Sequence, residues 1–315
     1  MDVLLKTTLA PRVQVAVAVA LIIAAATRLP LFPLHGWVRD IYSEAPLGVS
    51  IVIAGTASRL GAYLLVRVLL TADPDASKLL APFIAGLAAL TVIYAAIVAL
   101  RSADLRWATA YLAMVPGGLT VMGLAALTPI SIGGSVLSIF TGGLAAALIV
   151  AAAWTLTERA QTRSVQLLGG LGPRMPTMTW IFIVAALGLL GVPLLASFPA
   201  EAMIFFGSFK TQPVGAFAVV GGMVLTAVAL AMLAHRVLFG LPNPDAPAVS
   251  DASLGETWYL ALLAGGLIWV GLFPGGPKLP GTDQPVFDPG LVNVMSAGIS
   301  DITAPFVPPL PPGAT

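Results

Sequence analysis

The sequence predicts an all-α integral membrane protein, a polytopic bundle of about eight membrane-spanning helices. Hydrophobic residues make up 58% of the 315 residues and charged residues only 9%, and the mean hydropathy is +0.97. A soluble protein of this length needs far more charge to cover its surface. Several apolar runs reach about 20 residues, the length that crosses a bilayer as a helix. Because these runs are continuous and do not alternate, helices are favoured over the strands of a membrane barrel.

Eight apolar runs mark the expected spans. They cover residues 12–30, 46–70, 80–100, 106–127, 134–156, 178–209, 214–239 and 256–273. The N-terminus lacks the plan of a cleaved signal peptide, so the first span is expected to be retained. Residues 1–275 are therefore expected to form one transmembrane domain, and the proline-rich residues 276–315 an extramembrane tail.

Two of these spans are expected to be discontinuous. The first ends in RLPLFPLHGW, where Pro30 and Pro33 cannot continue a helix without losing backbone hydrogen bonds. The sixth contains GLLGVPLLASFPAEAM, with Gly191 and two prolines ahead of Glu201. Broken helices at membrane depth are tolerated where the freed backbone lines a cavity or is buried in protein. In transporters such breaks often mark the ion path.

Composition excludes several kinds of site. The chain has no cysteine, which excludes disulfides, iron–sulfur clusters and thiolate metal sites within it. The two histidines, His35 and His235, are too few to suggest a haem or a metal site, so we predict no cofactor and no metal. No basic block accompanies the net charge of +1, and no nucleic-acid partner is expected.

Basic residues in the loops predict the orientation. One side collects Arg39, Arg101, Arg106, Arg159, Arg163, Arg174 and Arg236, and the other collects Lys6, Arg12, Lys78, Lys210 and Lys278. The excess favours the first side as cytoplasmic, which places both termini on the outer side. The expected location is a bacterial inner membrane.

Few ionisable side chains remain at membrane depth. These candidate site residues are Arg28, Arg59 and Glu201, with His35 and Glu44 near a helix end. Each costs at least about 2.5 kcal/mol at the centre of a helix, so each is expected to face the bundle interior or water. None of them suggests a catalytic centre.

Each candidate has a structural and a functional interpretation. Arg28 either snorkels from a helix end or acts in function, and neither is preferred. Arg59 lies deep in its span, which favours a functional or paired role. Glu201 either binds protons or pairs with an arginine. For His35, capping of the broken backbone is favoured over titration; for Trp37, an interfacial anchor is favoured over a ligand contact.

The same stretches carry a resemblance. RLPLFPLHGWVRDIYSEAPLGVSIVIAGTASRLGAYLLVR is similar to KLP-x-FP-x-H-x-WLPDAH-x-x-AP-x-x-GSV followed by LLKLGGYGLLR. SADLRWATAYLAMVPGG, GVPLLASFPAEAMIFFGSF and AHRVLFG follow TD-x-KRLIAYSSVSHMG, GLPG-x-x-NFVGEF-x-x-LFGSF and HR-x-x-FG. These motifs belong to the antiporter-like membrane subunits of respiratory complex I, shared with cation/proton antiporters and membrane-bound hydrogenases. From about residue 15 to 275 the chain most resembles the branch called subunit M in bacteria and subunit 4 in mitochondria.

The resemblance implies roles for three positions. Arg28 stands where the family has a lysine in its first broken helix, and Arg59 where it has the central lysine of the next helix. Glu201 stands at the ionisable residue of the second broken helix, through which protons are thought to exit. The family moves protons by switching lysine and carboxylate protonation along a hydrated polar axis at the membrane midplane.

The chain also departs from the family pattern. Both relay lysines are arginines, Pro116 replaces the histidine of SVSHMG, and Thr141 replaces that of the AHGL element. Arginine keeps its charge at any relevant pH, so it sets a field or pairs with a carboxylate but cannot relay a proton. Along the expected axis only Glu201, His35 and Glu44 remain titratable.

We therefore expect a membrane-arm subunit of a complex I-like ion-translocating redox complex that contributes to a proton pathway along the bilayer midplane. It would be a non-redox subunit of an NADH:quinone oxidoreductase-like or hydrogenase-like translocase. The alternative is a structural subunit that has lost transport and only scaffolds the membrane arm. A stand-alone cation/proton antiporter is a third, less favoured interpretation, because half of the family's helices are missing.

The expected partners follow from the same resemblance. They are the lipid bilayer, other membrane subunits, and a separate chain that supplies the six helices which family members carry before this stretch. That missing half includes a glutamate that pairs with the first lysine of the family. A remnant that has lost this half is the other expectation.

Overall fold

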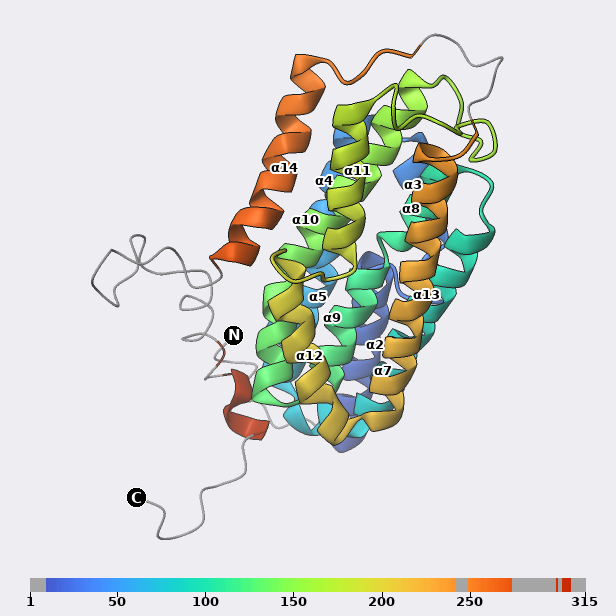
Figure 1. Ribbon diagram of the computed structural model, residues 1–315. Helices are drawn as coiled ribbons and strands as arrows, with labels where there is room; N and C mark the ends of the chain where they lie inside the picture. Colours follow the sequence, from blue (N-terminus) through green and yellow to red (C-terminus); the bar gives the residue numbers. More distant parts are fainter. Residues whose placement is uncertain (1–9, 242–248, 274–298, 300–301, 307–315) are drawn as a thin grey trace, which may run out of the picture.

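The computed structural model describes residues 10–241, 249–273, 299 and 302–306. Within them the chain is a bundle of helices that run up and down along one direction (Figure 1), and the only extended pairing they contain is one isolated bridge between Asp104 and Ser164. The predicted all-α class is confirmed. Most of the predicted tail, residues 276–315, lies outside the described residues.

The helices follow one another with short connections. They are α2 (Pro11–Arg28), α3 (Gly36–Glu44), α4 (Leu47–Gly55), η1 (Ala57–Arg59), α5 (Leu60–Leu64), η2 (Leu65–Leu69), α6 (Leu70–Ala72), α7 (Pro74–Arg101), α8 (Leu105–Leu112), α9 (Val115–Ala125), α10 (Pro129–Arg159), α11 (Pro176–Leu189), α12 (Ser197–Thr211), α13 (Pro213–Leu238), α14 (Leu254–Leu272) and η3 (Ala304–Phe306).

Within the part of the chain that the structure describes, six helical segments are long and apolar enough to cross a membrane. They are Leu47–Ala72, Pro74–Arg101, Leu105–Ala125, Pro129–Arg159, Pro213–Leu238 and Leu254–Leu272. Each coincides with one predicted run. The two remaining runs are the discontinuous ones: the run 12–30 corresponds to α2, which ends at the first break, and the run 178–209 spans α11 and α12. Some helices are longer than predicted, and α7 starts at Pro74 because the Asp73 carboxylate caps the Ala76 N–H at 3.0 Å.

The first break separates α2 from α3 as predicted. The backbone N–H of Phe32, freed in the break, donates to Thr91 Oγ1 of α7 at 3.0 Å. The Trp37 indole donates to the Thr27 carbonyl at the end of α2 at 2.8 Å. The Trp37 side chain thus bridges the break, and its role as an interfacial anchor stays a prediction.

The second break, residues 190–196, separates α11 from α12. Gly191 and Leu194 have positive φ angles of 60° and 79°, which end the helical path. The Ala196 N–H donates to the carbonyl oxygen of Leu267 in α14 at 2.8 Å. The freed backbone of this break is thus held by a neighbouring helix, as membrane depth requires.

Two further interruptions are absent from the sequence prediction. The run 106–127 is two helices, α8 and α9, because Pro116 lacks an N–H to continue the helix across Ala113 and Met114. The run 46–70 contains a 3₁₀ turn, η1, that ends at Arg59, and then a π-helical turn, η2. π-turns inside helices frequently lie near functional sites.

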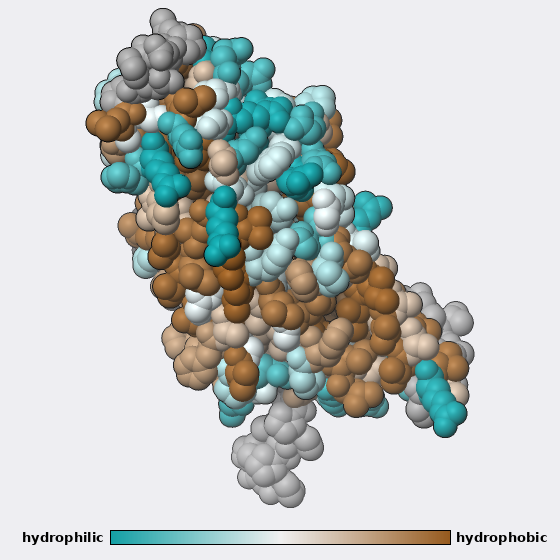
Figure 2. Space-filling model, turned by 90° about the vertical axis from the view of Figure 1, so that its right-hand side faces the viewer, coloured by the Kyte–Doolittle hydropathy of each residue, from teal (hydrophilic) through white to brown (hydrophobic). Residues whose placement is uncertain are grey.

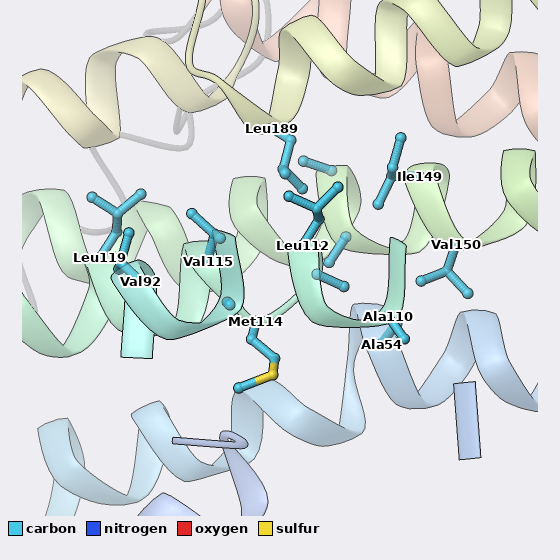
Figure 3. Close-up of a cluster of buried hydrophobic side chains, with 14 of the residues drawn as sticks. Ala54, Val92, Ala110, Leu112, Met114, Val115, Leu119, Ile149, Val150 and Leu189 are labelled. Atoms are coloured by element: carbon cyan, nitrogen blue, oxygen red, sulfur yellow. The ribbon is translucent and has the colours of Figure 1, made fainter. Parts of the chain in front are cut away.

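The core is centred on α8, α9 and α10. In the apolar 18-residue stretch of Leu105–Ala125, 94% of the residues are buried, whereas the corresponding stretch of α14 is only 17% buried. Helix α14 therefore lies at the edge of the bundle. Figure 3 shows Leu112 of α8 and Val115 and Leu119 of α9 among side chains of α4, α7, α10 and α11. The broken helices α2–α3 and α11–α12 pack around this centre (Figure 1).

Polar and apolar residues separate along the bundle. On the face drawn in Figure 2, hydrophilic residues gather in the upper part, and hydrophobic residues cover most of the lower part, with smaller hydrophilic areas at the lower end. Large side chains such as Phe83, Phe206 and Val214 are exposed on the bundle. An apolar band of this kind matches a lipid-facing surface.

Candidate functional site

Arg59 is buried at the point where α4 changes into the 3₁₀ turn η1. Only 4% of the residue is exposed. Its Nη2 donates to the carbonyl oxygens of Gly142, at 3.2 Å, and Ala113, at 3.4 Å, while Nε has no partner among the described residues. The hydrogen bonds that the described residues offer to this permanently charged group come from backbone carbonyl oxygens.

Close packing of α4 against α10 makes this position possible. A Cβ added to Gly143 of α10 would meet the Gly55 carbonyl oxygen and lie 3.3 Å from Arg59 Cγ. The two adjacent glycines, Gly142 and Gly143, thus leave room for the arginine stem and expose a carbonyl to it. On the other side Arg59 lines a hollow of about 530 Å³ between α4–α5, α10 and α14.

Glu201 is buried on the first turns of α12, directly after the second break. It is 7% exposed, and its carboxyl group lies against the backbone of Gly191. None of the ion pairs formed by the described residues includes it. The alternative of an ion pair between Glu201 and an arginine is therefore not what the structure shows.

His35 lies in an aromatic cluster at the first break. Its ring is 4.6 Å from that of Tyr94, 5.7 Å from Phe32 and 6.1 Å from Tyr111, measured between centroids. Its side chain makes no capping bond to α3, and Nδ1 is buried without a partner among the described residues. The expectation that His35 caps the broken backbone is wrong, because rings from α7 and α8 hold the imidazole elsewhere.

Arg28 lies apart from these buried groups. It is the last residue of α2, and its side chain is exposed on the flank formed by α2, α3 and α4. There it lines a hollow of about 560 Å³ together with Trp37 and Ser58. Within the described part of the chain no carboxylate pairs with it.

Glu44 lies at the rim of the bundle and not in its interior. Its carboxylate accepts two hydrogen bonds from Arg163, at 2.5 Å and 3.2 Å, and is largely exposed. This bond and the charge of Glu44 raise the pKa of Arg163. The structure thus brings Arg59, Glu201 and His35 into the interior at helix interruptions, and places Arg28 and Glu44 outside it.

The two positions that lack the family histidines are packed closely. Pro116, at the start of α9, lies against Gly142, the residue whose carbonyl accepts from Arg59. Thr141 is fully buried, and its hydroxyl donates to the Leu137 carbonyl at 3.2 Å. Neither a proline nor a threonine side chain titrates near neutral pH, so neither replaces the proton-binding capacity of a histidine.

Buried hydroxyls line the contacts of α9, α10 and α12. Thr120 Oγ1 and Ser138 Oγ lie 2.9 Å apart, and Ser135 donates to the Thr120 carbonyl at 2.9 Å. Ser197 Oγ, at the start of α12, is buried with no partner among the described residues. Buried polar atoms of this kind are usually satisfied by ordered water.

Arg106 is a buried structural charge that the sequence did not reveal, because its position in the sequence marked it only as a loop cation. It is 6% exposed, and its Cζ lies 3.3 Å from the Trp154 ring centroid. Nε donates to Thr157 Oγ1 at 2.6 Å, and Nη1 to the Ser43 carbonyl at 3.4 Å. The i, i+3 pair of Trp154 and Thr157 on α10 is the signal that points to it. This network ties α3, α8 and α10 together at the polar end of the bundle, the upper end where hydrophilic residues gather (Figure 2).

Comparison with known proteins identifies the family. The profile described as NADH:quinone oxidoreductase/Mrp antiporter, TM, matches residues 2–226. The chain belongs to this family. Its sequence is 31% identical over 287 residues to NADH-quinone oxidoreductase subunit M of Pseudomonas aeruginosa, covering 90% of this chain and 54% of that protein. It is 30% identical over 275 residues to NADH-ubiquinone oxidoreductase chain 4 of Triticum aestivum, covering 87% and 56%.

Solved structures share the fold of this family member. A chain of respiratory complex I from Thermus thermophilus matches with a TM-score of 0.81 at 24% identity, over 95% of this chain and 61% of that one. A chain of the Mrp complex from Dietzia sp. matches with a TM-score of 0.80 at 17% identity, over 92% and 60%. The chain spans little more than half the length of the relatives it matches.

Proposed function

We propose that this chain is an antiporter-like membrane-arm subunit that helps to translocate ions in a complex I-like redox assembly. The observation that carries the proposal is the burial of Arg59 and Glu201 at helix interruptions in a member of this family. Ionisable groups inside a membrane protein are costly and are usually kept for function. Discontinuous helices around such groups are a common feature of ion sites in transporters.

In this proposal the side chains have different roles. Glu201 binds and releases a proton, because it is the one buried carboxyl group of the described residues. Arg59 holds a fixed positive charge that sets the field and does not relay. His35 and the buried hydroxyls around Ser138 supply hydrogen-bonding positions through which water can complete the path.

The test uses the assembled complex in inverted membrane vesicles, with proton movement followed by a pH-sensitive dye and NADH as the first donor tried. Glu201→Gln and Arg59→Met are each expected to lower the rate of proton movement at least tenfold while the complex still assembles. Glu158→Gln, the same change at an exposed rim position, is the matched control. Unchanged proton movement in both interior variants would replace the proposal with a purely structural subunit.

We further propose that membrane helices outside this chain cover the flank of α2, α3 and α4. Arg28 is exposed there beside a hollow of about 560 Å³, and no carboxylate of the described residues neutralises it. An uncompensated arginine at membrane depth favours a partner helix that carries an acidic side chain. Arg28→Glu is expected to abolish co-purification of that partner. Arg67→Glu, the same change at another exposed arginine, is the control and should leave co-purification intact.

We propose a location in a bacterial inner membrane, with the polar end that carries Arg39, Arg106 and Arg163 in the cytoplasm and both termini outside. The absence of cysteine from the sequence makes this simple to test. A single cysteine at Gln161 should react with a membrane-impermeant maleimide only after cells are opened. A cysteine at Thr211, at the opposite end of the bundle, should react in intact cells. The reverse labelling would invert the orientation.

A further inference from the structure

Glu201 and the second break meet at a single backbone position. Gly191 has a φ angle of 60°, in the left-handed region. A Cβ added to Gly191 would meet Glu201 Oε2 and would lie 2.5 Å from Cδ and 2.9 Å from Oε1. The carboxyl group therefore occupies the space that any other residue at position 191 would take.

The break around Gly191 is itself held in place. The N–H of Ala196 donates to the Leu267 carbonyl of α14 at 2.8 Å, and the N–H of Val192 donates back to Leu187 at 3.2 Å. The backbone segment of the second break, which contacts the carboxyl group, is thus held by hydrogen bonds at both ends. It cannot move aside easily to make room for an added side chain.

Little else in the described part of the chain holds this carboxyl group. Among the described residues, no side chain of α9, α10, α11, α13 or α14 forms an ion pair with Glu201. Its location therefore depends on shape, through the contact with Gly191, and not on a bonded partner.

We propose that Gly191 is a positioning residue for Glu201: the missing side chain of Gly191 is what allows the carboxyl group to lie in the second break. This inference rests on the proposed proton-binding role of Glu201. A side chain at position 191 displaces the carboxyl group from the break and changes its surroundings. The proton equilibrium of Glu201 then changes with it.

The experiment measures that equilibrium in the purified full chain in lipid nanodiscs. Acid–base infrared difference spectra report carboxyl protonation, and Glu201→Gln identifies the band of Glu201. In Gly191→Ala the pH midpoint of this band is expected to shift by about one unit or more, which is a tenfold change in proton affinity. Gly191→Asn should give a similar shift, because asparagine tolerates positive φ and the steric overlap remains.

Two further variants separate the contact from general damage. Gly191→Ala combined with Glu201→Asp shortens the acid and is expected to bring the midpoint back toward that of Glu201→Asp alone. Gly221→Ala, on α13 with open space around it, is the control for an added methyl group and should leave the midpoint unchanged. An unshifted midpoint in folded Gly191→Ala would overturn the proposal.

Folding provides a second readout. If Gly191→Ala fails to fold, Gly191→Ala combined with Glu201→Ala should restore folding, since the overlap is then gone. Equal failure of both variants would assign the defect to backbone strain and would also overturn the proposal. The outcome is separate from the transport test: Glu201→Gln that moves protons normally refutes the proposed function but leaves the contact with Gly191 measurable.

Discussion

Arg59 donates a hydrogen bond to the carbonyl oxygen of Gly142 at 3.2 Å, and among the described residues no carboxylate pairs with that arginine. The positive charge is balanced by two carbonyl dipoles, of Gly142 and Ala113. A lysine in this place could lose its proton, whereas an arginine cannot. The interior of the bundle therefore carries a fixed charge at a costly location, which is typical of a site retained for function.

Replacing Arg59 with methionine should make the protein more stable. The change removes a buried charge that lacks a counter-ion and keeps an unbranched apolar stem, so we expect a gain of about 1 kcal/mol or more. The measurement is the thermal unfolding midpoint of the purified chain in detergent. Arg67→Met, on the exposed side of the same span, should change the midpoint little. A loss of stability in Arg59→Met would show instead that the carbonyl bonds are structurally required.

Gly143 should not tolerate a side chain. A Cβ there meets the Gly55 carbonyl oxygen, so Gly143→Ala pushes α4 and α10 apart and is expected to cost about 1–3 kcal/mol. Gly86→Ala, in α7 with nothing near the added methyl group, serves as the control and should be neutral or slightly stabilising. Unfolding midpoints of the two variants check this. Similar midpoints would mean that the helix contact is less tight than the structure indicates.

Arg106 should not be replaceable by lysine. Lysine lacks the planar group that stacks on Trp154 and cannot reach Thr157 and Ser43 together, so Arg106→Lys is expected to cost about 1.5–3 kcal/mol. Arg101→Lys, exposed at the same end of the bundle, should cost little. The fluorescence emission of Trp154 adds a local measurement, because Arg106→Lys removes the guanidinium group that stacks on its ring in the wild type. Equal stability of the two variants would contradict a structural role for the Arg106 stack.

The sequence predicted those features that depend on local chemistry. Pro30, Pro33 and Gly191 indicate the two breaks because their backbone effects do not depend on the neighbours. The depth of Arg59 and Glu201 follows from the apolar length around them. Burial of these two side chains was therefore predictable before their contacts were known.

Features that depend on tertiary contacts were not predictable. Helix α2 is apolar on all sides, so its pattern does not indicate whether Arg28 faces the core or the flank. The aromatic cluster of His35 requires Tyr94 and Tyr111, which are distant in sequence. The burial of Arg106 requires α3 and α10 to meet beside it.

Asp251 should make stability depend on pH at the polar end of the bundle. Its carboxylate caps the start of α11 by accepting from the N–H of Thr177 at 2.8 Å and of Met178 at 3.3 Å. Burial raises the pKa of Asp251, but these bonds outweigh burial and hold the pKa below its ordinary value. The contribution to stability is therefore present above about pH 4, the unfolded value, and is lost as the pH falls through the folded pKa.

Variants of Asp251 separate the cap from its charge. At pH 7 Asp251→Ala is expected to lower the free energy of unfolding by about 0.5–2 kcal/mol, the usual worth of a helix cap. Asp251→Asn keeps an acceptor and should lose less, and its difference from the wild type should shrink as the pH falls below about 4. Unfolding midpoints at pH 7 and pH 3 test this directly. A difference that stays constant between these two pH values would show that the carboxylate charge at α11 contributes nothing to stability.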